Sequence, residues 1–325
     1  MIDENGVKPL ISISIPVYNE EGNIHRLHDR LCKLANSIAD QYSMEFVFTD
    51  NRSTDNSWQL IKSIAQQDPR VRAFRFSRNF GFQKSILTNY VNTRGAAVLQ
   101  LDADLQDPPE LLPEFLKKWE EGYKVVYGVR KVRPEPWLMR QFRRSGYWLI
   151  DRLAGYPVPK NVGDFRLIDR DVICAIAKFN DQAPYLRGTI ASLGFSQIGI
   201  DYEREARQEG KSKFSIRSLL RLGIDGILTT STIPLRLATY VGAGITMLAF
   251  IGAFYYIFLK LMNPELPIGV ASTSILILFS LGLNSIFLGL IGEYIIRMHN
   301  NIRGGDIAVI DDAIDPVGVR EMGDK

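Results

Sequence analysis

The sequence predicts an α/β protein in which helices cover both faces of a largely parallel β-sheet, followed by a hairpin of two membrane-spanning helices. Between residues 11 and 129, short β-rich runs alternate with segments that have the length and apolar spacing of helices, as in a parallel sheet with crossover helices. Leu237–Leu259 and Ile268–Gly292 contain no charged residue, which is typical of transmembrane helices. A basic segment, 204–236, precedes the first of these runs.

The elements of the α/β part follow one another in a regular order. Strands are predicted at 11–17, 45–50, 71–76, 96–102, 124–129 and 197–203. Helices are predicted within 20–42, at 83–93 and 108–121, and from residue 169 onward. In the acidic tail a short edge strand is predicted at 307–310. Ligands of such sheets bind beyond the carboxyl ends of the strands, so a site is expected there.

The two apolar runs are long enough to cross a membrane. As helices rising 1.5 Å per residue they reach roughly 34 to 38 Å, more than a hydrocarbon core of about 30 Å. The connection 260–267 holds one basic residue, whereas 204–236 holds seven. The positive-inside rule therefore places both termini in the cytoplasm. The first ten residues lack the basic start and apolar run of a secretory signal, which agrees with a cytoplasmic N-terminal part.

These features divide the chain into four regions. They are a cytoplasmic α/β domain at 1–214, an interfacial amphipathic helix at 215–232, two transmembrane helices at 233–298 and a cytoplasmic tail at 299–325. The interfacial helix is predicted because apolar residues recur at helical spacing directly before the first apolar run, with Arg217 and Arg221 on the opposite side.

Several function classes are excluded by charge and by motifs that are missing. The formal net charge of +3 is small and nucleic-acid-binding motifs are lacking, so no nucleic acid partner is expected. Neither a GxGxxG fingerprint nor a GxxxxGK[ST] loop occurs. This argues against a dinucleotide-dependent oxidoreductase and against a P-loop nucleotide triphosphatase.

An acidic pair follows the predicted strand at 96–102. Asp102 and Asp104 come directly after a hydrophobic run, and such a pair suits Mg2+ or Mn2+, because hard cations prefer oxygen ligands and a diphosphate can supply the remaining ones. The alternative is a solvated acidic turn. Two further polar strand ends in the same sheet favour the metal site.

Those two strand ends carry candidates for nucleoside binding. Asp50 suits hydrogen bonds from a base or a ribose, although its loop can also cap a helix through Ser53 and Asp55. Tyr18 and Glu20 suit a nucleoside in the same crevice, or simply begin the following helix.

Taken together and in this order, the motifs resemble glycosyltransferase family 2, and within it the polyisoprenyl-phosphate glycosyltransferases, which include bactoprenol glucosyltransferases and dolichol-phosphate mannose synthases. The motifs are Pro16-Val17-Tyr18-Asn19-Glu20, Asp50–Asp55, Arg78-Asn79-Phe80-Gly81, Leu101–Pro109 and Gly163-Asp164-Phe165-Arg166. The resemblance runs from about Ile11 to Arg303. It implies a GT-A (Rossmann-like) fold and an inverting transfer.

The resemblance also implies roles for individual residues. Asp102, Asp104 and Gln106 would hold the divalent ion, and the nucleotide sugar would contact Pro16, Tyr18, Glu20, Asp50 and Asp102. Many relatives read Asp-Asp-Gly-Ser at the second strand, whereas this chain has Asp50-Asn51-Arg52-Ser53. The resemblance therefore implies no nucleotide contact for Asn51, the second of these positions.

Basic residues near the first apolar run suit the phosphate of a lipid acceptor. Arg207 and Lys213 resemble the acceptor-phosphate motif of the family, and Arg130 and Arg144 resemble two further phosphate-binding arginines, with Arg143 competing for the second assignment. For Arg204 and Lys211 the alternative of ordinary juxtamembrane charges that set the topology has equal weight.

Asp164 stands where this superfamily usually places its catalytic base. A phosphate monoester has a second pKa near 6, so the attacking oxygen is already anionic at neutral pH and gains little from a base. Asp164 is therefore predicted to take part in catalysis, together with Asp104, either by removing a proton or by orienting the acceptor, holding an arginine or balancing charge.

The predicted function is transfer of a hexose from a nucleotide diphosphate sugar, UDP-glucose by family resemblance, to polyisoprenyl phosphate, undecaprenyl phosphate in a bacterial inner membrane. GDP-mannose and other UDP-sugars are alternative donors. The competing functions are a processive polysaccharide synthase, which would carry a Q-x-x-R-W motif that is not found here, and an inactive membrane adaptor that binds nucleotide sugar. Asn284, Gly282 and Gly289 in the second apolar run suggest helix packing, as in a homo-oligomer.

Overall fold

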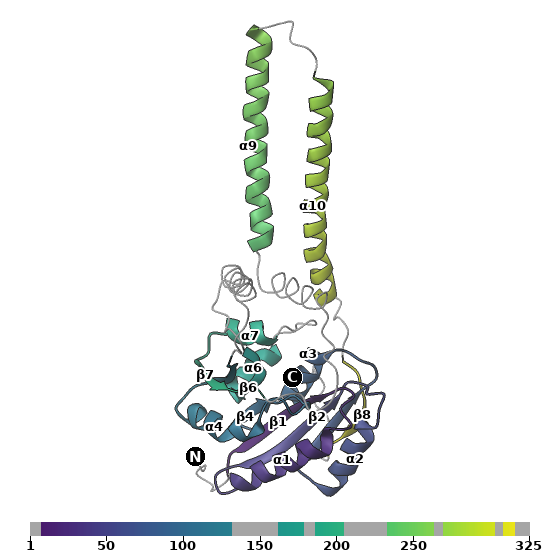
Figure 1. Cartoon of the computed structure of the whole chain (residues 1–325), viewed down its shortest axis with the longest axis vertical. Coiled ribbons are helices and arrows are strands. Elements are labelled where there is room, and N and C mark those ends of the chain that lie inside the picture. Colours follow the sequence, from purple (N-terminus) through teal and green to yellow (C-terminus); the bar gives the residue numbers. More distant parts are fainter. Residues whose placement is uncertain are drawn as a thin grey trace.

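The structure, a computed structural model, describes residues 8–131, 162–178, 186–204, 233–262, 269–302 and 308–315. A compact α/β domain lies at one end and a long two-helix hairpin extends from it (Figure 1). Three of the predicted site residues, Arg144, Arg207 and Lys213, lie outside the described residues, as does the predicted interfacial helix at 215–232.

One eight-stranded sheet forms the centre of the domain, with the order β7-β5-β6-β4-β1-β2-β3-β8. The strands are β1 Leu10–Val17, β2 Ser43–Asp50, β3 Val71–Phe76, β4 Ala97–Gln100, β5 Val125–Arg130, β6 Val162–Asp169, β7 Gln197–Tyr202 and β8 Ile310–Ile314. Strands β3, β2, β1 and β4 are mutually parallel, with registers such as Val17↔Asp50 and Ser14↔Gln100. Their carboxyl ends therefore share one edge of the sheet.

The sheet is mixed rather than largely parallel, which corrects the sequence prediction. Strand β6 lies between β4 and β5 and runs antiparallel to both, and β8 pairs antiparallel with β3 at the far edge. Alternating strands and helices indicate parallel neighbours only where a crossover helix joins them, and β6 and β8 are both reached by longer connections. The Gly163–Arg166 motif consequently lies on a strand beside β4.

Helices cover both faces of the sheet, and each face has its own core. Leucine and isoleucine side chains of α1, α2 and α4 pack on one face against alternate residues of β1 such as Ile13. Helices α3, α6 and α7 pack on the other face around Tyr90 and Ile168. The helices are α1 Ile24–Ser37, α2 Ser57–Gln67, α3 Phe82–Asn92, α4 Leu112–Glu120, preceded by a 3-10 turn Pro109–Leu111, α6 Arg170–Lys178 and α7 Leu186–Ser192.

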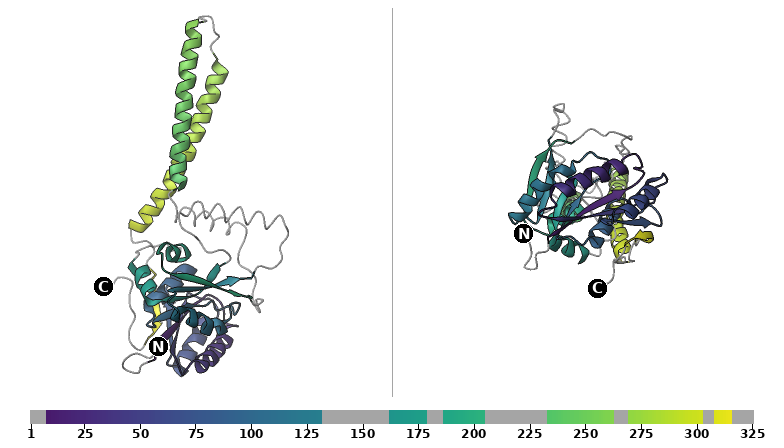
Figure 2. Two further views of the ribbon diagram at one scale, coloured as in Figure 1. Left: turned by 90° about the vertical axis from the view of Figure 1, so that its left-hand side faces the viewer. Right: turned by 90° about the horizontal axis from the view of Figure 1, so that it is seen from below.

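The two apolar runs form the helices α9, Ile233–Met262, and α10, Val270–Ile302, which lie antiparallel and rise away from the sheet (Figure 2). Both are long and apolar enough to cross a membrane, over Ala238–Leu259 and Phe279–Ile296. Their described apolar side chains are exposed, with Phe254 71% accessible. Helix α10 continues past Gly292, where the uncharged run ends, and past residue 298, where the predicted transmembrane region ends, because Glu293 and Arg297 are compatible with a helix.

The tail returns to the α/β domain and completes its sheet. The predicted edge strand at 307–310 is displaced: β8 begins at Ile310, where that prediction ends. Its pairing with β3 contains an irregularity between Arg75 and Phe76, opposite which Asp311 has no partner in the register. The segment that follows the hairpin in sequence is thus part of the same sheet as β1 and β2.

Candidate active site

Three loops meet at the carboxyl edge of the parallel strands, and each contains a residue in the left-handed backbone region. These residues are Asn19 after β1, Arg52 after β2 and Leu105 after β4, with φ of 56°, 61° and 60°. Non-glycine residues rarely adopt this conformation, and they do so most often where a binding or catalytic site constrains the chain. Among the described non-glycine residues, all those with this conformation lie at this edge.

The loops after β1 and β2 are bonded to each other. The backbone N–H of Asn19 donates to the Ser53 hydroxyl at 2.9 Å, and the N–H of Thr54 donates to the Asn19 side chain at 2.8 Å. Asp50 is fully buried, accepts from the Ser53 N–H at 3.1 Å and lies 3.1 Å from Arg75 Nε. Burial raises the pKa of Asp50, and the Ser53 bonds and the Arg75 charge oppose that rise. The two loops are therefore held in a fixed relation.

The remaining candidates for the nucleotide differ in what they can offer. Tyr18 is 37% exposed at the strand end, so its side chain is partly accessible to solvent. Glu20 is partly exposed and accepts a hydrogen bond from the Asn23 amide. Pro16 is buried within β1, in register with Thr49, which limits it to shaping the strand.

Asp102 and Asp104 lie in the loop after β4, and their charges are poorly compensated. Oδ1 of Asp102 is buried and has no hydrogen-bond partner among the residues that the structure describes. Burial, together with the neighbouring carboxylates of Asp164, Asp107 and Asp104, raises the pKa of Asp102 to about 8. Oδ1 of Asp104 accepts from the Gln106 N–H at 3.2 Å. A divalent cation would satisfy the unpaired oxygen and offset the clustered negative charge, so these residues fit the predicted metal site.

Asp107 lies behind this pair at the centre of a basic and aromatic network. Its Oδ1 accepts from the Tyr202 hydroxyl at 2.5 Å and from Arg204 Nε at 3.1 Å. Arg204 also lies 3.9 Å from Asp104. Arg130 NH2 is 3.7 Å from Asp107 Oδ2, and Arg130 Nε donates to the Tyr202 hydroxyl. The predicted phosphate ligand Arg130 is thus adjacent to the carboxylate cluster.

Asp164 points into the same cluster from β6 and is bound to an arginine by two hydrogen bonds. Arg187 Nε donates to Oδ1 at 2.8 Å and Arg187 NH2 donates to Oδ2 at 2.6 Å. Although burial opposes it, this bonding, with the charges of Arg166 and Arg130, lowers the pKa of Asp164. A general base would need a pKa nearer neutrality and an accessible oxygen, so this geometry favours a role in holding Arg187.

Another group of metal-binding side chains within the described residues lies outside this edge. His28, Cys32 and Asp68 bring their ligand atoms within 4.8 Å of one another. The guanidinium of Arg70 donates to Asp68 at 2.7 Å and to the Cys32 sulfur at 3.2 Å. A cation already compensates this group, in contrast to Asp102.

Comparison with known proteins shows which family the chain, including the residues of this edge, belongs to. Residues 12–176 match the model of "Glycosyl transferase family 2", a range that includes Asp50, Asp102, Asp104 and Asp164. The chain belongs to glycosyl transferase family 2. It is therefore a glycosyltransferase, and the family together with the observed sheet confirms the predicted GT-A fold.

Relatives within the family match almost the whole chain. An uncharacterized glycosyltransferase of Bacillus subtilis, YkcC, is 36% identical over 300 residues, 92% of each chain. A prophage bactoprenol glucosyl transferase homolog of Escherichia coli is 32% identical over 290 residues, 89% of this chain and 94% of its own. A solved structure of S. aureus TarS residues 1–349 in complex with UDP-GlcNAc superimposes with a TM-score of 0.47 at 17% identity, covering 68% of this chain and 66% of that one.

The structure adds three residues that the sequence did not single out for this site. Arg187 and Tyr202 come from α7 and β7, which are distant in sequence from the carboxylates that they contact. Asp107 was part of a predicted motif without a role of its own, and its 1% side-chain exposure marks it as the buried centre of the network. Only the pairing of β6 and β7 with β5 brings these side chains together.

Asp102→Asn is expected to stabilise the metal-free glycosyltransferase. The folded-state pKa of Asp102 is raised from 3.8 to about 8, so its contribution to stability is complete below about pH 4 and is lost as pH rises through about 8. Asparagine removes this loss, on the order of a few kcal/mol at pH 8. Thermal unfolding in EDTA should show a gain in Tm for the variant that is clearly larger at pH 8 than at pH 5. If wild type and Asp102→Asn had the same Tm at both pH values, Asp102 would not carry a buried, uncompensated charge.

Gly163→Ala is expected to impair transfer with little effect on stability. A Cβ at Gly163 would lie 2.3 Å from Arg130 NH2, and the flexible arginine would move away from Asp107 and Tyr202. If Arg130 binds phosphate, we expect the KM for the lipid acceptor to rise about tenfold, as for the loss of one charged hydrogen bond. Gly244→Ala is the control for the glycine change, because Gly244 lies within helix α9 and its added Cβ meets no described atom within 4 Å beyond the backbone of its own helix. A normal acceptor KM in Gly163→Ala would argue against this placement of Arg130.

Proposed function

We propose that this protein transfers glucose from UDP-glucose to a polyisoprenyl phosphate at the cytoplasmic face of a membrane, and that the transfer depends on Mg2+ or Mn2+. The observation that carries the proposal is the buried, unpaired Oδ1 of Asp102 among four carboxylates at the strand edge. In a family of sugar transferases, a cation at this position would face the diphosphate of the donor.

The lipid acceptor is supported by relatives and by the helical hairpin. Proteins named bactoprenol glucosyl transferase, for example that of Shigella phage SfX, are 32% identical over 89% of this chain. The exposed apolar surfaces of α9 and α10 suit a membrane. We propose that both helices span it, with the α/β domain and both termini in the cytoplasm of a bacterium.

The domain limits given by the sequence, 1–214, 215–232, 233–298 and 299–325, remain part of this proposal. None of the described residues lies within 4 Å of a Cβ added at Gly282 or Gly289, and we propose that these glycines pack against a second copy in a homo-oligomer.

We propose that the residues of the site divide between donor and acceptor. Asp102, Asp104 and Gln106 would hold the cation, which would supply positive charge to offset the negative charge of the leaving diphosphate. Tyr18, Glu20 and Asp50 contact the nucleoside, and Pro16 shapes their strand end. Arg130, with Arg144, Arg207 and Lys213, holds the acceptor phosphate.

The reaction is a direct displacement at the anomeric carbon. An oxygen of the acceptor phosphate forms the new bond as the bond to the donor diphosphate breaks, which inverts the anomeric centre. Because the acceptor is already ionised at neutral pH, the side chains act mainly by positioning and by electrostatic stabilisation. Asp164 holds Arg187 beside the two anions instead of removing a proton.

The test is transfer of radiolabelled sugar to undecaprenyl phosphate by the purified full-length protein, with a panel of UDP- and GDP-sugars. Each donor is assayed with Mg2+, with Mn2+ and with EDTA. Metal-dependent labelling of lipid from UDP-glucose is the expected result, and labelling from another donor would correct the sugar. No labelling from any donor, together with no binding of nucleotide sugar, would favour an inactive adaptor.

A further inference from the structure

The backbone of Arg52 has an unfavourable conformation that requires an explanation. Its φ is 61°, in the left-handed region that glycine adopts without strain and other residues adopt at a cost. The residue lies in the loop after β2, between the buried Asp50 and Ser53. Nothing in the local sequence favours an arginine at such a position.

The side chain of Arg52 is held by the tail of the chain. Arg52 NH1 donates to Asp311 Oδ2 at 2.6 Å, across 259 positions of sequence. Asp311 lies at the irregularity where β8 pairs with β3, so its backbone is displaced from the regular ladder. The two side chains are 43% and 51% exposed.

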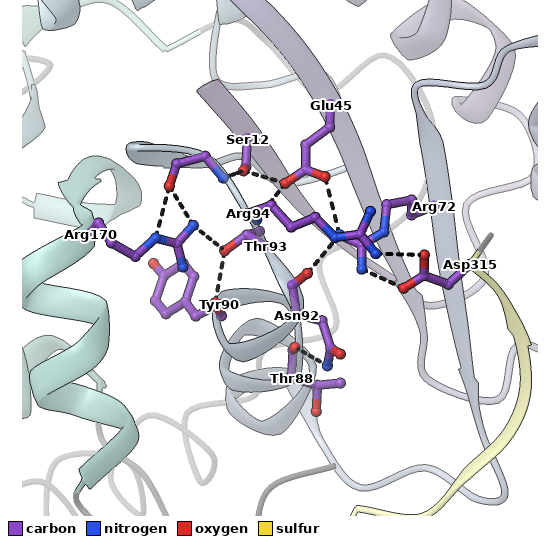
Figure 3. Close-up of polar contacts among 11 residues, drawn as sticks. Ser12, Glu45, Arg72, Thr88, Tyr90, Asn92, Thr93, Arg94, Arg170 and Asp315 are labelled. Atoms are coloured by element: carbon purple, nitrogen blue, oxygen red, sulfur yellow. Dashed lines mark hydrogen bonds and ion pairs between the residues drawn. The ribbon is translucent and has the colours of Figure 1, made fainter. Parts of the chain in front are cut away.

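Strand β8 is itself firmly attached to the domain. Asp315, with a side chain only 1% exposed, pairs with Arg72 and, at 2.9 Å, with Arg94 (Figure 3). Arg72 is buried and also bound to Glu45 at 3.1 Å. Between Asp311 and Asp315, the indole of Trp58 donates to Asp312 at 3.1 Å. Asp311 is therefore a fixed point from which Arg52 can be held.

The conformation of Arg52 determines how the donor loop is closed. The next residue, Ser53, directs its N–H to Asp50 and its hydroxyl oxygen to the Asn19 N–H. A change of the Arg52 backbone would turn the Ser53 peptide and disturb both contacts. These contacts join the two strand ends that carry Tyr18 and Asp50.

We propose that Asp311 is a positioning residue for donor binding: by holding Arg52 in the left-handed conformation, the tail strand β8 keeps the loop after β2 in its nucleotide-binding form. The inference rests on the proposed function only in taking this loop as part of the donor site. The tail thereby acts on the affinity for the nucleotide sugar without touching it.

Steady-state kinetics of the full-length protein test the proposal. We expect Asp311→Ala to raise the KM for the nucleotide sugar about threefold at low salt, the size expected for a half-exposed ion pair. The kcat and the KM for the lipid should not change. Asp311→Glu should restore the donor KM, and 0.5 M NaCl should reduce the difference between wild type and Asp311→Ala.

The Arg52→Gly background distinguishes positioning from a general loosening of the tail. Glycine adopts the left-handed conformation without a partner, so Asp311→Ala should have no further effect in Arg52→Gly protein. Lys62→Ala is the matched control, because Lys62 also forms a half-exposed pair with β8, at 3.6 Å to Asp312, but comes from α2 and not from the loop. An unchanged donor KM in Asp311→Ala, or an equal rise in both backgrounds, would overturn the proposal.

Hydrogen exchange gives a readout that does not depend on transfer. Amide exchange of a peptide covering residues 50–57 should be faster in Asp311→Ala than in wild type and unchanged in Lys62→Ala. If wild type transfers no sugar, the proposed function fails while exchange still tests the link between Asp311 and the loop. If transfer is normal and exchange of the loop does not respond to Asp311→Ala, the inference fails alone.

Discussion

Asp104→Asn is expected to reduce sugar transfer by roughly a thousandfold, the scale of a lost metal ligand in a metal-dependent transfer. Asparagine has nearly the same shape and can still accept the hydrogen bond that the Gln106 N–H donates to Asp104. The change removes one negative charge from a cluster that already includes Asp102 and Asp107. The expected defect is therefore in binding the cation and the donor diphosphate, with the fold unchanged.

The measurement for Asp104→Asn is metal-dependent transfer alongside binding of nucleotide sugar by calorimetry. Glu114→Gln is the matched control, because Glu114 is an exposed carboxylate on α4 outside the site. The thermal stability of both variants in the same detergent shows whether they are folded. Near-normal turnover of Asp104→Asn with metal present would count decisively against the metal site.

Asp164→Asn and Arg187→Lys are expected to slow transfer by a similar factor, roughly a hundredfold for the loss of a charged pair at the site whose carboxylate is buried. Each change abolishes the two-point bond between the side chains, for which a planar guanidinium is required. Because the pKa of Asp164 is lowered, the carboxylate is ionised throughout the neutral range. We therefore expect the pH dependence of transfer in Asp164→Asn to keep the shape it has in wild type.

The double variant Asp164→Asn/Arg187→Gln separates the two roles of Asp164. If the residues act as a pair, the double change should cost no more than the worse single one, since coupled residues are not additive. Arg187 is 37% exposed, so its substitution should leave the protein folded. Two results together would instead make Asp164 a catalytic base. The pH–rate profile of wild type would fall at acidic pH while that of Asp164→Asn would not, and Arg187→Lys would transfer sugar normally.

The sequence predicts most of the sheet because its strands are short, apolar and bounded by polar loops. The strand at Val71–Phe76 is confirmed to the residue, and the helix predicted at 83–93 differs from α3 by one residue at each end. The helix predicted within 20–42 is shorter, because Asp40 and Gln41 lie in a turn that follows Ser37. Local periodicity thus determines the type of each element better than its ends.

The direction and neighbours of strands are determined by long-range pairing, which periodicity does not encode. The Asp164 motif has no apolar run before it that would identify β6 as an inner strand. The acidic residues of β8 have low β propensity, and their partners Arg52, Trp58 and Arg72 are distant in sequence. For the same reason the sequence identified Asp102, Asp104 and Asp164 through their motif but not Arg187.

The return of the tail to the sheet also has a consequence for how the chain folds. Arg72 of β3 and Asp315 are 243 positions apart, so at a synthesis rate of about 5–20 residues per second β3 waits roughly 12 to 50 s for its neighbour. During this interval β3 is an open edge, and both apolar helices are made before it is covered. Arg72 and Arg75 are the kind of charged residues that discourage an open edge from pairing with other chains. Arg72 is later neutralised by Asp315, and Arg75 comes to lie opposite Asp312 in the strand register. The sheet is therefore completed only in chains whose helical hairpin has already been synthesised.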